Sequence, residues 1–186
     1  MEQEIENPAE HGTHGHDDGH SSGLITTVGV LIALLAVTAA AVDTVKEMES
    51  ADALGLKNES VLLQTRASDQ WAFFQAKSIK KNSYQIAAAL ATGPVKAEFE
   101  AQAEHNGSDE KEIKEAATKL EEQSHEKWDE SAHHAHREHQ LDIGETLIHV
   151  GMAVGSLAIF LRRRLPVIMA GAMAALGIAV SVAAYL

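Results

Sequence analysis

Two groups of histidines carry the side chains best suited to metal chemistry. The first lies in the segment HGTHGHDDGH near the N-terminus and contains His11, His14, His16 and His20. Imidazoles beside carboxylates bind borderline divalent metals such as zinc, nickel or copper. The surrounding glycines and polar residues predict a disordered tail, so we expect loose capture of a metal rather than a preformed cage. The alternative is a solvated tail whose charge changes with pH.

The second group lies between residues 125 and 139, where five histidines fall within fifteen positions. His125, Asp129 and His133 follow one another at intervals of four and share a helical face. The last two have the spacing of a two-ligand helical metal site, and His136 lies close by in the sequence. The alternative is a charged helix that presents these side chains to water.

Ionisable residues also occur inside or beside apolar blocks, where charge is costly. Glu145 and His149 are one helical turn apart within the block 143–161, and Asp43 directly follows another apolar block. Glu145 and His149 could hydrogen-bond and change each other's protonation, as a proton or cation path requires. The alternative places Glu145 at the membrane surface and His149 against a neighbouring helix.

The known catalytic patterns are absent from the sequence. It contains no GxxxxGK[ST], GxGxxG, GxSxG or HExxH pattern. With no cysteine, it has no thiol nucleophile, disulfide or iron–sulfur ligand. A net charge of -12 opposes nucleic-acid binding, which requires a basic face. We therefore expect neither an enzyme nor a nucleic-acid-binding protein.

Three apolar blocks predict membrane-spanning helices. They cover residues 24–42, 143–161 and 166–186, and each is close to the roughly 20 residues that cross about 30 Å of hydrocarbon. Helices are expected because every backbone amide in lipid must be hydrogen-bonded within the segment. The alternative, helices buried in a soluble core, is less compatible with blocks of this length. We predict an all-α integral membrane protein with three transmembrane helices.

The charges around these blocks predict their orientation. Residues 1–23 contain no Lys or Arg, so we expect an uncleaved signal anchor rather than a cleavable signal peptide. The turn at 162–165 contains three arginines, Arg162, Arg163 and Arg164. The positive-inside rule places this turn in the cytoplasm and the segment 43–142 on the other side, opposed only by two lysines after the first block.

The polar segment 43–142 is rich in helix-forming residues. Turn residues near Gly93 and Gly107 predict a long helix, an irregular tip over 92–108, and a return helix into the second span. This makes a long helical hairpin that projects between the first and second spans. Neither arm of the hairpin keeps an apolar heptad over three repeats, so the sequence does not predict a regular coiled coil.

Apolar side chains are sparse in this hairpin. Their pattern favours association between copies of the chain. The ascending arm carries the aromatic residues Trp71, Phe73 and Phe74. A lone hairpin would bury few such side chains, whereas an oligomer would bury more. The alternative is a flexible hairpin solvated on most sides.

Small residues predict close contacts between the spanning helices. Gly151 and Gly155 form a GxxxG pattern, and Gly29 with Ala33 gives a similar small-xxx-small pair. We expect these positions to pack against other helices, within one chain or between copies.

The stretch ASDQWAFFQAKSIK at residues 67–80 resembles the signature of an uncharacterised bacterial membrane-protein family, catalogued as domain of unknown function 4337. The resemblance extends from the acidic, histidine-containing N-terminus to the final arginine turn. It implies a multi-pass protein of the bacterial inner membrane. It implies no activity, cofactor or catalytic residue.

From these patterns we predict an oligomeric scaffold in the lipid bilayer, or an accessory subunit of another membrane protein complex. The alternative is a homo-oligomeric channel or transporter for protons or metal cations, lined by Glu145 and His149.

Overall fold

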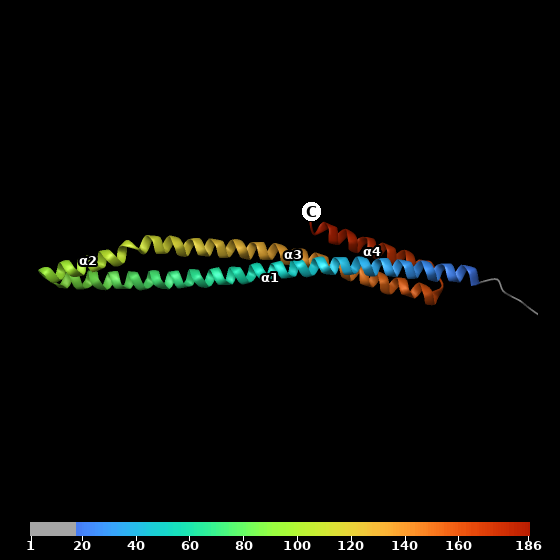
Figure 1. Ribbon diagram of the computed structural model, residues 1–186, viewed down its shortest axis with the longest axis horizontal. Helices are drawn as coiled ribbons and strands as arrows, with labels where there is room; N and C mark the ends of the chain where they lie inside the picture. The colour runs from blue at the N-terminus through green and yellow to red at the C-terminus, as the bar shows by residue number, and fades with distance from the viewer. Residues whose placement is uncertain (1–17) are drawn as a thin grey trace, which may run out of the picture. The chain divides into compact units, whose positions relative to one another are not determined.

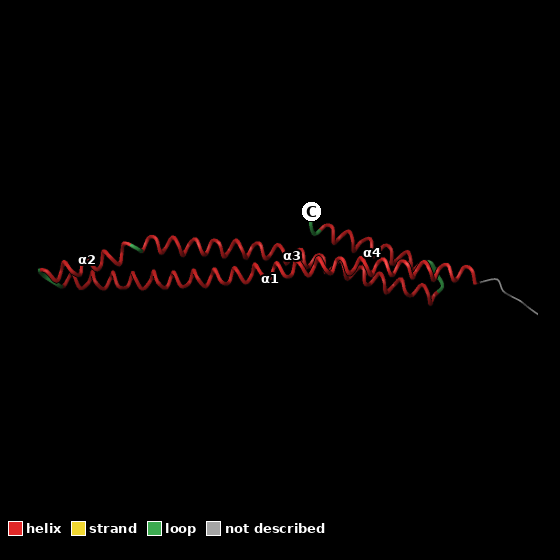
Figure 2. Tube along the Cα trace, in the orientation of Figure 1, coloured by secondary structure: helices red, strands yellow, loops and turns green. Residues whose placement is uncertain are grey.

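The computed structural model describes the backbone of residues 18–186 and the side chains of residues 23–186. It contains four helices, α1 (Asp18–Leu90), α2 (Pro94–Ser108), α3 (Glu110–Leu161) and α4 (Leu165–Ala183), shown in Figure 1. Short turns connect them, and the described part of the chain contains no strand (Figure 2). The predicted all-α fold is confirmed.

The chain divides into two compact units. One unit, which we call the apolar unit, contains the described residues up to Thr44 together with Gln140–Leu186. The other, which we call the arm, is Val45–His139. Helix α1 contributes to both units and runs for 73 residues.

Three helical stretches, containing α1, α3 and α4, are long and apolar enough to cross a membrane, as predicted. Only 17%, 28% and 28% of the residues in their most apolar windows are buried within the chain. Helices in the core of a soluble monomer would be covered by protein. The exposed apolar side chains therefore do not fit that alternative.

Helix α1 ends at Leu90, and the chain reverses at Gly93 and Pro94. Gly93 has a φ of 66°, a left-handed conformation that glycine adopts without steric cost. Pro94 begins α2, where its fixed φ suits the first helical position and its missing N–H is not needed. The reversal of the chain at the tip thus follows from two adjacent residues.

The predicted irregular tip over 92–108 is wrong for most of its length, because Pro94–Ser108 forms α2. Asn106 does not act as a helix breaker: it is buried, and its Nδ2 donates to the Gln102 carbonyl one turn earlier at 2.7 Å. The helix ends only at Ser108, whose hydroxyl donates to the His105 carbonyl at 2.9 Å. The polar side chains of Asn106 and Ser108 thus hydrogen-bond within the helix, and the helix continues through a stretch that was expected to be irregular.

In the arm, α1 and α3 lie side by side (Figure 1) and bury small side chains at intervals of seven residues. These residues, all at most 8% exposed, are Ala53, Ser60 and Ala67 on α1 and Ala117, Ser124 and Ser131 on α3. We call them the seam. The repeat is that of a coiled coil. The sequence did not predict a regular coiled coil, because the side chains that repeat every seven residues are small alanines and serines and give little apolar signal.

The apolar unit is held together by close helix crossings. Its core consists of Leu35, Ala39, Ile148 and Ala174, with other apolar side chains packed around them. A Cβ added at Gly144 would collide with the Ser181 hydroxyl and lie 2.7 Å from the Gly177 carbonyl oxygen. Glycine is required there because the α3 and α4 backbones approach so closely.

Candidate functional site

The three aromatic residues predicted to form an interaction surface divide between two sides of α1. Trp71 faces α3, where its Nε1 donates to Glu121 Oε1 at 3.0 Å. Phe74 packs edge-to-face on Trp71, with ring centroids 5.7 Å apart. Phe73 is half-exposed, and Lys77 Nζ lies 5.7 Å from its ring centroid. Phe73 is therefore the most exposed of the three, while Trp71 and Phe74 are half-buried.

Buried serines join the two helices of the arm. Ser60 Oγ donates to the Ser124 carbonyl at 2.8 Å, and Ser124 Oγ donates to the Ser60 carbonyl at 2.9 Å. Ser131 Oγ donates to the Ala53 carbonyl at 2.8 Å. Each serine hydroxyl therefore has a hydrogen-bond acceptor inside the buried contact, so burying these serines leaves none of their hydroxyls unpaired.

Charged side chains tie α1 to the start of α3. Lys77 Nζ lies 3.1 Å from Asp109 Oδ2, and Lys81 Nζ lies 2.9 Å from Glu110 Oε2. Ser78 Oγ donates to the other oxygen of Glu110 at 2.8 Å. The hydrogen bond from Lys77 lowers the pKa of Asp109, and that from Lys81 lowers the pKa of Glu110. Both carboxylates therefore favour their charged form at this junction.

One buried carboxylate was not identified from the sequence. Glu49 is 8% exposed, and its Oε2 lies 2.6 Å from Nδ1 of His134 on α3. His134 belongs to the second histidine group, but it faces α1 and not its histidine neighbours. The sequence could indicate this contact only if His134 were first placed on the helical face that continues the seam.

The remaining members of the second histidine group lie on the exposed side of α3. His125, Asp129, His133 and His136 are all exposed. Within the described residues, no group of three or more His, Cys, Asp or Glu side chains is arranged to hold a metal ion. His11, His14 and His16 lie outside the described residues, as does the side chain of His20. A zinc, nickel or copper site therefore stays a prediction.

Glu145 and His149 lie together in the apolar unit, although not within hydrogen-bonding distance. His149 Nδ1 is 3.7 Å from Glu145 Oε1. The Glu145 side chain is 12% exposed and that of His149 is 52% exposed, so the imidazole points away from its own chain. Asp43, in the same unit, is half-buried.

The small residues of the apolar unit fall into two classes. A Cβ at Gly151 would lie 3.0 Å from the Ala170 carbonyl oxygen, and one at Gly155 would lie 3.1 Å from the Ala170 Cβ. Both glycines therefore lie at the contact between α3 and α4. Gly29 has no described atom near its Cβ position, and Ala33 is exposed. This pair faces outward.

The arginines Arg162, Arg163 and Arg164 lie in the exposed turn between α3 and α4. Arg162 has a φ of 49°, which is uncommon for a residue other than glycine. It allows the chain to reverse over a very short connection.

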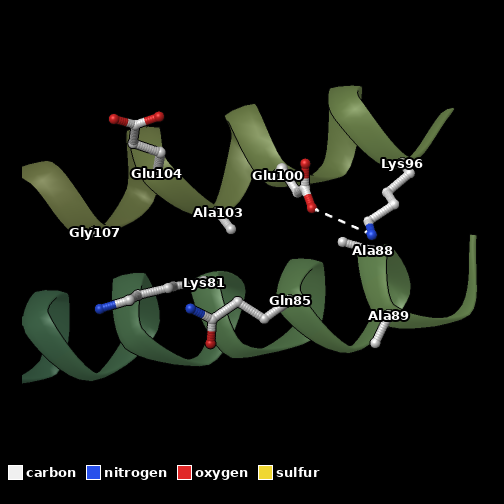
Figure 3. Close-up of a pocket in the computed structure, with 9 residues that line it drawn as sticks. All are labelled: Lys81, Gln85, Ala88, Ala89, Lys96, Glu100, Ala103, Glu104 and Gly107. Atoms are coloured by element: carbon white, nitrogen blue, oxygen red, sulfur yellow. Dashed lines mark ion pairs between the residues drawn. The ribbon is translucent and has the colours of Figure 1, made fainter. Parts of the chain in front are cut away.

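A groove of about 540 Å³ lies between the end of α1 and α2 (Figure 3). Two lysines and two glutamates line it, together with Gln85, three alanines and a glycine. Lys96 pairs with Glu100 at 3.8 Å, and Lys81 pairs with Glu110. The groove therefore presents no excess of one charge that would select an ionic ligand.

The comparisons with known proteins give one match. The family described as "Domain of unknown function (DUF4337)" matches residues 24–186, which include the three apolar blocks and the whole arm. Neither the curated proteins nor the solved structures contain a match to the chain.

Proposed function

This chain belongs to the DUF4337 family, and we propose that it is a membrane-anchored structural protein whose arm holds a membrane assembly together. One observation carries the proposal: the arm buries small side chains in its seam and leaves large ones outside. Leu54, Ile79 and Ile86 are 60%, 65% and 65% exposed. A hairpin built only for its own stability would use such side chains inside.

The rest of the structure supports a mechanical role. The serine bonds and the charged junction at Asp109 and Glu110 hold the two arm helices in register. The apolar unit would anchor the protein in the bilayer of a bacterial inner membrane, with the Arg162–Arg164 turn in the cytoplasm and the arm on the opposite side. The assembly consists of copies of this chain or includes another membrane protein complex.

Native mass spectrometry of gently solubilised protein tests this function, and bound metal can be read from the same spectra. We expect a homo-oligomer of defined stoichiometry, or a complex with another membrane protein. Dilution in detergent serves as the control for association caused by concentration alone. A strictly monomeric protein, with no partner in native membranes, would contradict the scaffold role.

A second candidate function is a path for protons or metal cations, and the exposure of His149 favours it. An imidazole that faces hydrocarbon is costly, so in an oligomer it would face a helix contact or water. Thr146 and Asp142 are exposed on the same helical face of α3. These side chains would form a polar stripe along α3, and the stripes of several copies of α3 would line the path.

Flux measurements in proteoliposomes separate the two functions. The double variant Glu145→Gln and His149→Ala should abolish proton or cation flux if the stripe conducts. His139→Ala, an exposed histidine on α3 in the arm, is the matched control and should leave flux unchanged. Unchanged flux in the double variant would remove the channel function while leaving the scaffold function standing.

A further inference from the structure

The outward side of α1 in the arm is almost free of charge. The seam repeat on α1 continues through half-buried Phe74 and Lys81 to buried Ala88. Positions one, two and five residues after each repeat position face away from α3. Between residues 54 and 90 these are seventeen positions; all are exposed, and only Asp69 is charged. We call them the outer face of α1.

Large apolar side chains lie at intervals along the outer face of α1. They are 50% to 84% exposed and comprise Leu54, Val61, Leu62, Ile79, Ile86 and Leu90. The positions between them hold mostly Ala, Ser, Asn and Gln. Removing this face from water would bury apolar area and leave few charges to desolvate.

The opposite side of the arm has the reverse character. The equivalent positions on α3 between residues 111 and 136 number twelve; seven are Asp, Glu or Lys and three are His. That face keeps its hydration and gains little from burial. The arm is therefore two-sided, with one solvated helix and one helix suited to a contact.

We propose that the outer face of α1 is the surface through which two copies of this chain associate. A charged partner helix would lose hydration without meeting an opposite charge there, whereas the same face of a second copy matches it in kind. Asp69 is the exception, and Arg66 lies one turn before it on the same helix with the opposite charge.

The size of the face is sufficient for a dimer contact. Thirty-seven helical residues extend about 55 Å, and a strip about 10 Å wide along them covers roughly 550 Å² per copy. Two copies would then bury roughly 1,100 Å², just above the lower limit of about 1,000 Å² for a specific interface. Such a contact depends on the anchoring apolar unit to hold the copies parallel and close together.

This inference deepens the proposed scaffold function by naming its contact and its partner. Because the chain has no cysteine, single cysteines report proximity without background. We would introduce Ile79→Cys or Ile86→Cys on the outer face of α1, and Asp129→Cys on the exposed face of α3 as the matched control. All three positions are exposed, so the fold should not change.

Oxidation of the full-length protein in lipid nanodiscs should link the outer-face variants into dimers at least tenfold more than Asp129→Cys. Equal cross-linking from both faces, or a link from Ile79→Cys to a different protein, would overturn the inference. An oligomer by native mass spectrometry without outer-face cross-links would also overturn it, yet would leave the scaffold function intact. A monomer by native mass spectrometry would contradict both.

Charge substitution provides a second, independent readout. Leu62→Glu combined with Ile79→Glu should raise the dimer dissociation constant at least tenfold while the helical circular dichroism signal stays unchanged. Ala132→Glu, exposed on α3, is the control and should leave the dissociation constant within twofold. An unchanged dimer in the double variant would overturn the inference.

Discussion

Ser60 and Ser124 bind each other's backbone across the arm. Each hydroxyl donates to the carbonyl of the other residue, at 2.8 Å and 2.9 Å, and the two hydroxyl oxygens are 3.1 Å apart. The residues are 64 positions apart in the chain and both are buried. This exchange requires the α1 and α3 backbones to lie very close together, which only small side chains in the seam permit.

The first prediction concerns this contact. Ser60→Leu should destabilise the arm by about 1–3 kcal/mol because a larger side chain forces the helices apart. Ser60→Ala should cost only about 1 kcal/mol, the net value of a lost hydrogen bond. Denaturant unfolding of the purified protein measures both. Ala132→Leu, at an exposed position on α3, should cause little change; an equal loss there would contradict the seam.

The second prediction concerns the effect of pH on the charged junction at Asp109 and Glu110. Asp109 and Glu110 have lowered pKa values in the folded protein because Lys77 and Lys81 bind their charged forms. Their stabilising contribution is therefore complete above the unfolded pKa values, near 4, and is lost as the pH falls through the lower folded values. Electron spin resonance distances between labels at Gln85→Cys and Glu104→Cys should be narrowly distributed at pH 6 and broader at pH 3.

The combined variant Lys77→Met and Lys81→Met is the control for this experiment. Because it removes both cationic partners, the broad distribution should be present already at pH 6. A broadening at pH 3 that is unaffected by the two substitutions would contradict the assignment to this junction.

The third prediction concerns the Glu49–His134 contact. His134→Ala removes a partner 2.6 Å from a buried carboxylate, so we expect a destabilisation of about 1–3 kcal/mol. The double variant Glu49→Leu and His134→Leu should recover part of this loss because no buried carboxylate remains. His133→Ala, at an exposed position next in sequence, should be neutral in the same unfolding assay.

The fourth prediction concerns the crossing of α3 and α4. Gly144→Ala should lower the thermal unfolding midpoint in detergent because its Cβ would clash with Ser181 and lie 2.7 Å from the Gly177 carbonyl oxygen. We expect a cost of about 1–3 kcal/mol. Gly171→Ala meets open space within the chain and should be neutral or stabilising by up to about 1 kcal/mol. Equal midpoints for the two variants would contradict the close crossing.

Much of the architecture was predictable because its signals are local. A run of apolar residues such as 24–42 identifies a potential membrane span without reference to any other part of the chain. Gly93 reverses the chain shortly after α1 ends at Leu90, and Pro94 begins α2, both through their own backbone preferences. The motif at residues 67–80 lies within the matched family region and was recognisable from its residues alone.

The arm packing was decided only in the tertiary structure. Alanine and serine give almost no hydrophobic signal, so the repeat at Ala53, Ser60 and Ala67 is inconspicuous until burial reveals it. Its partners lie on a helix that runs back along α1, and no local pattern specifies which faces of two long helices meet. For the same reason, the sequence could not distinguish His134, which binds Glu49, from its exposed neighbour His133.

The amino-acid sequence by itself determined the helical class, the three apolar helices and the reversal at Gly93, because each depends on residues within one or two turns of one another. The tertiary structure alone decided which small residues are buried, which carboxylate is paired and which side of α1 stays exposed. These depend on the approach of two backbones that are distant in sequence, and the side chains that permit this approach are too small to show it beforehand.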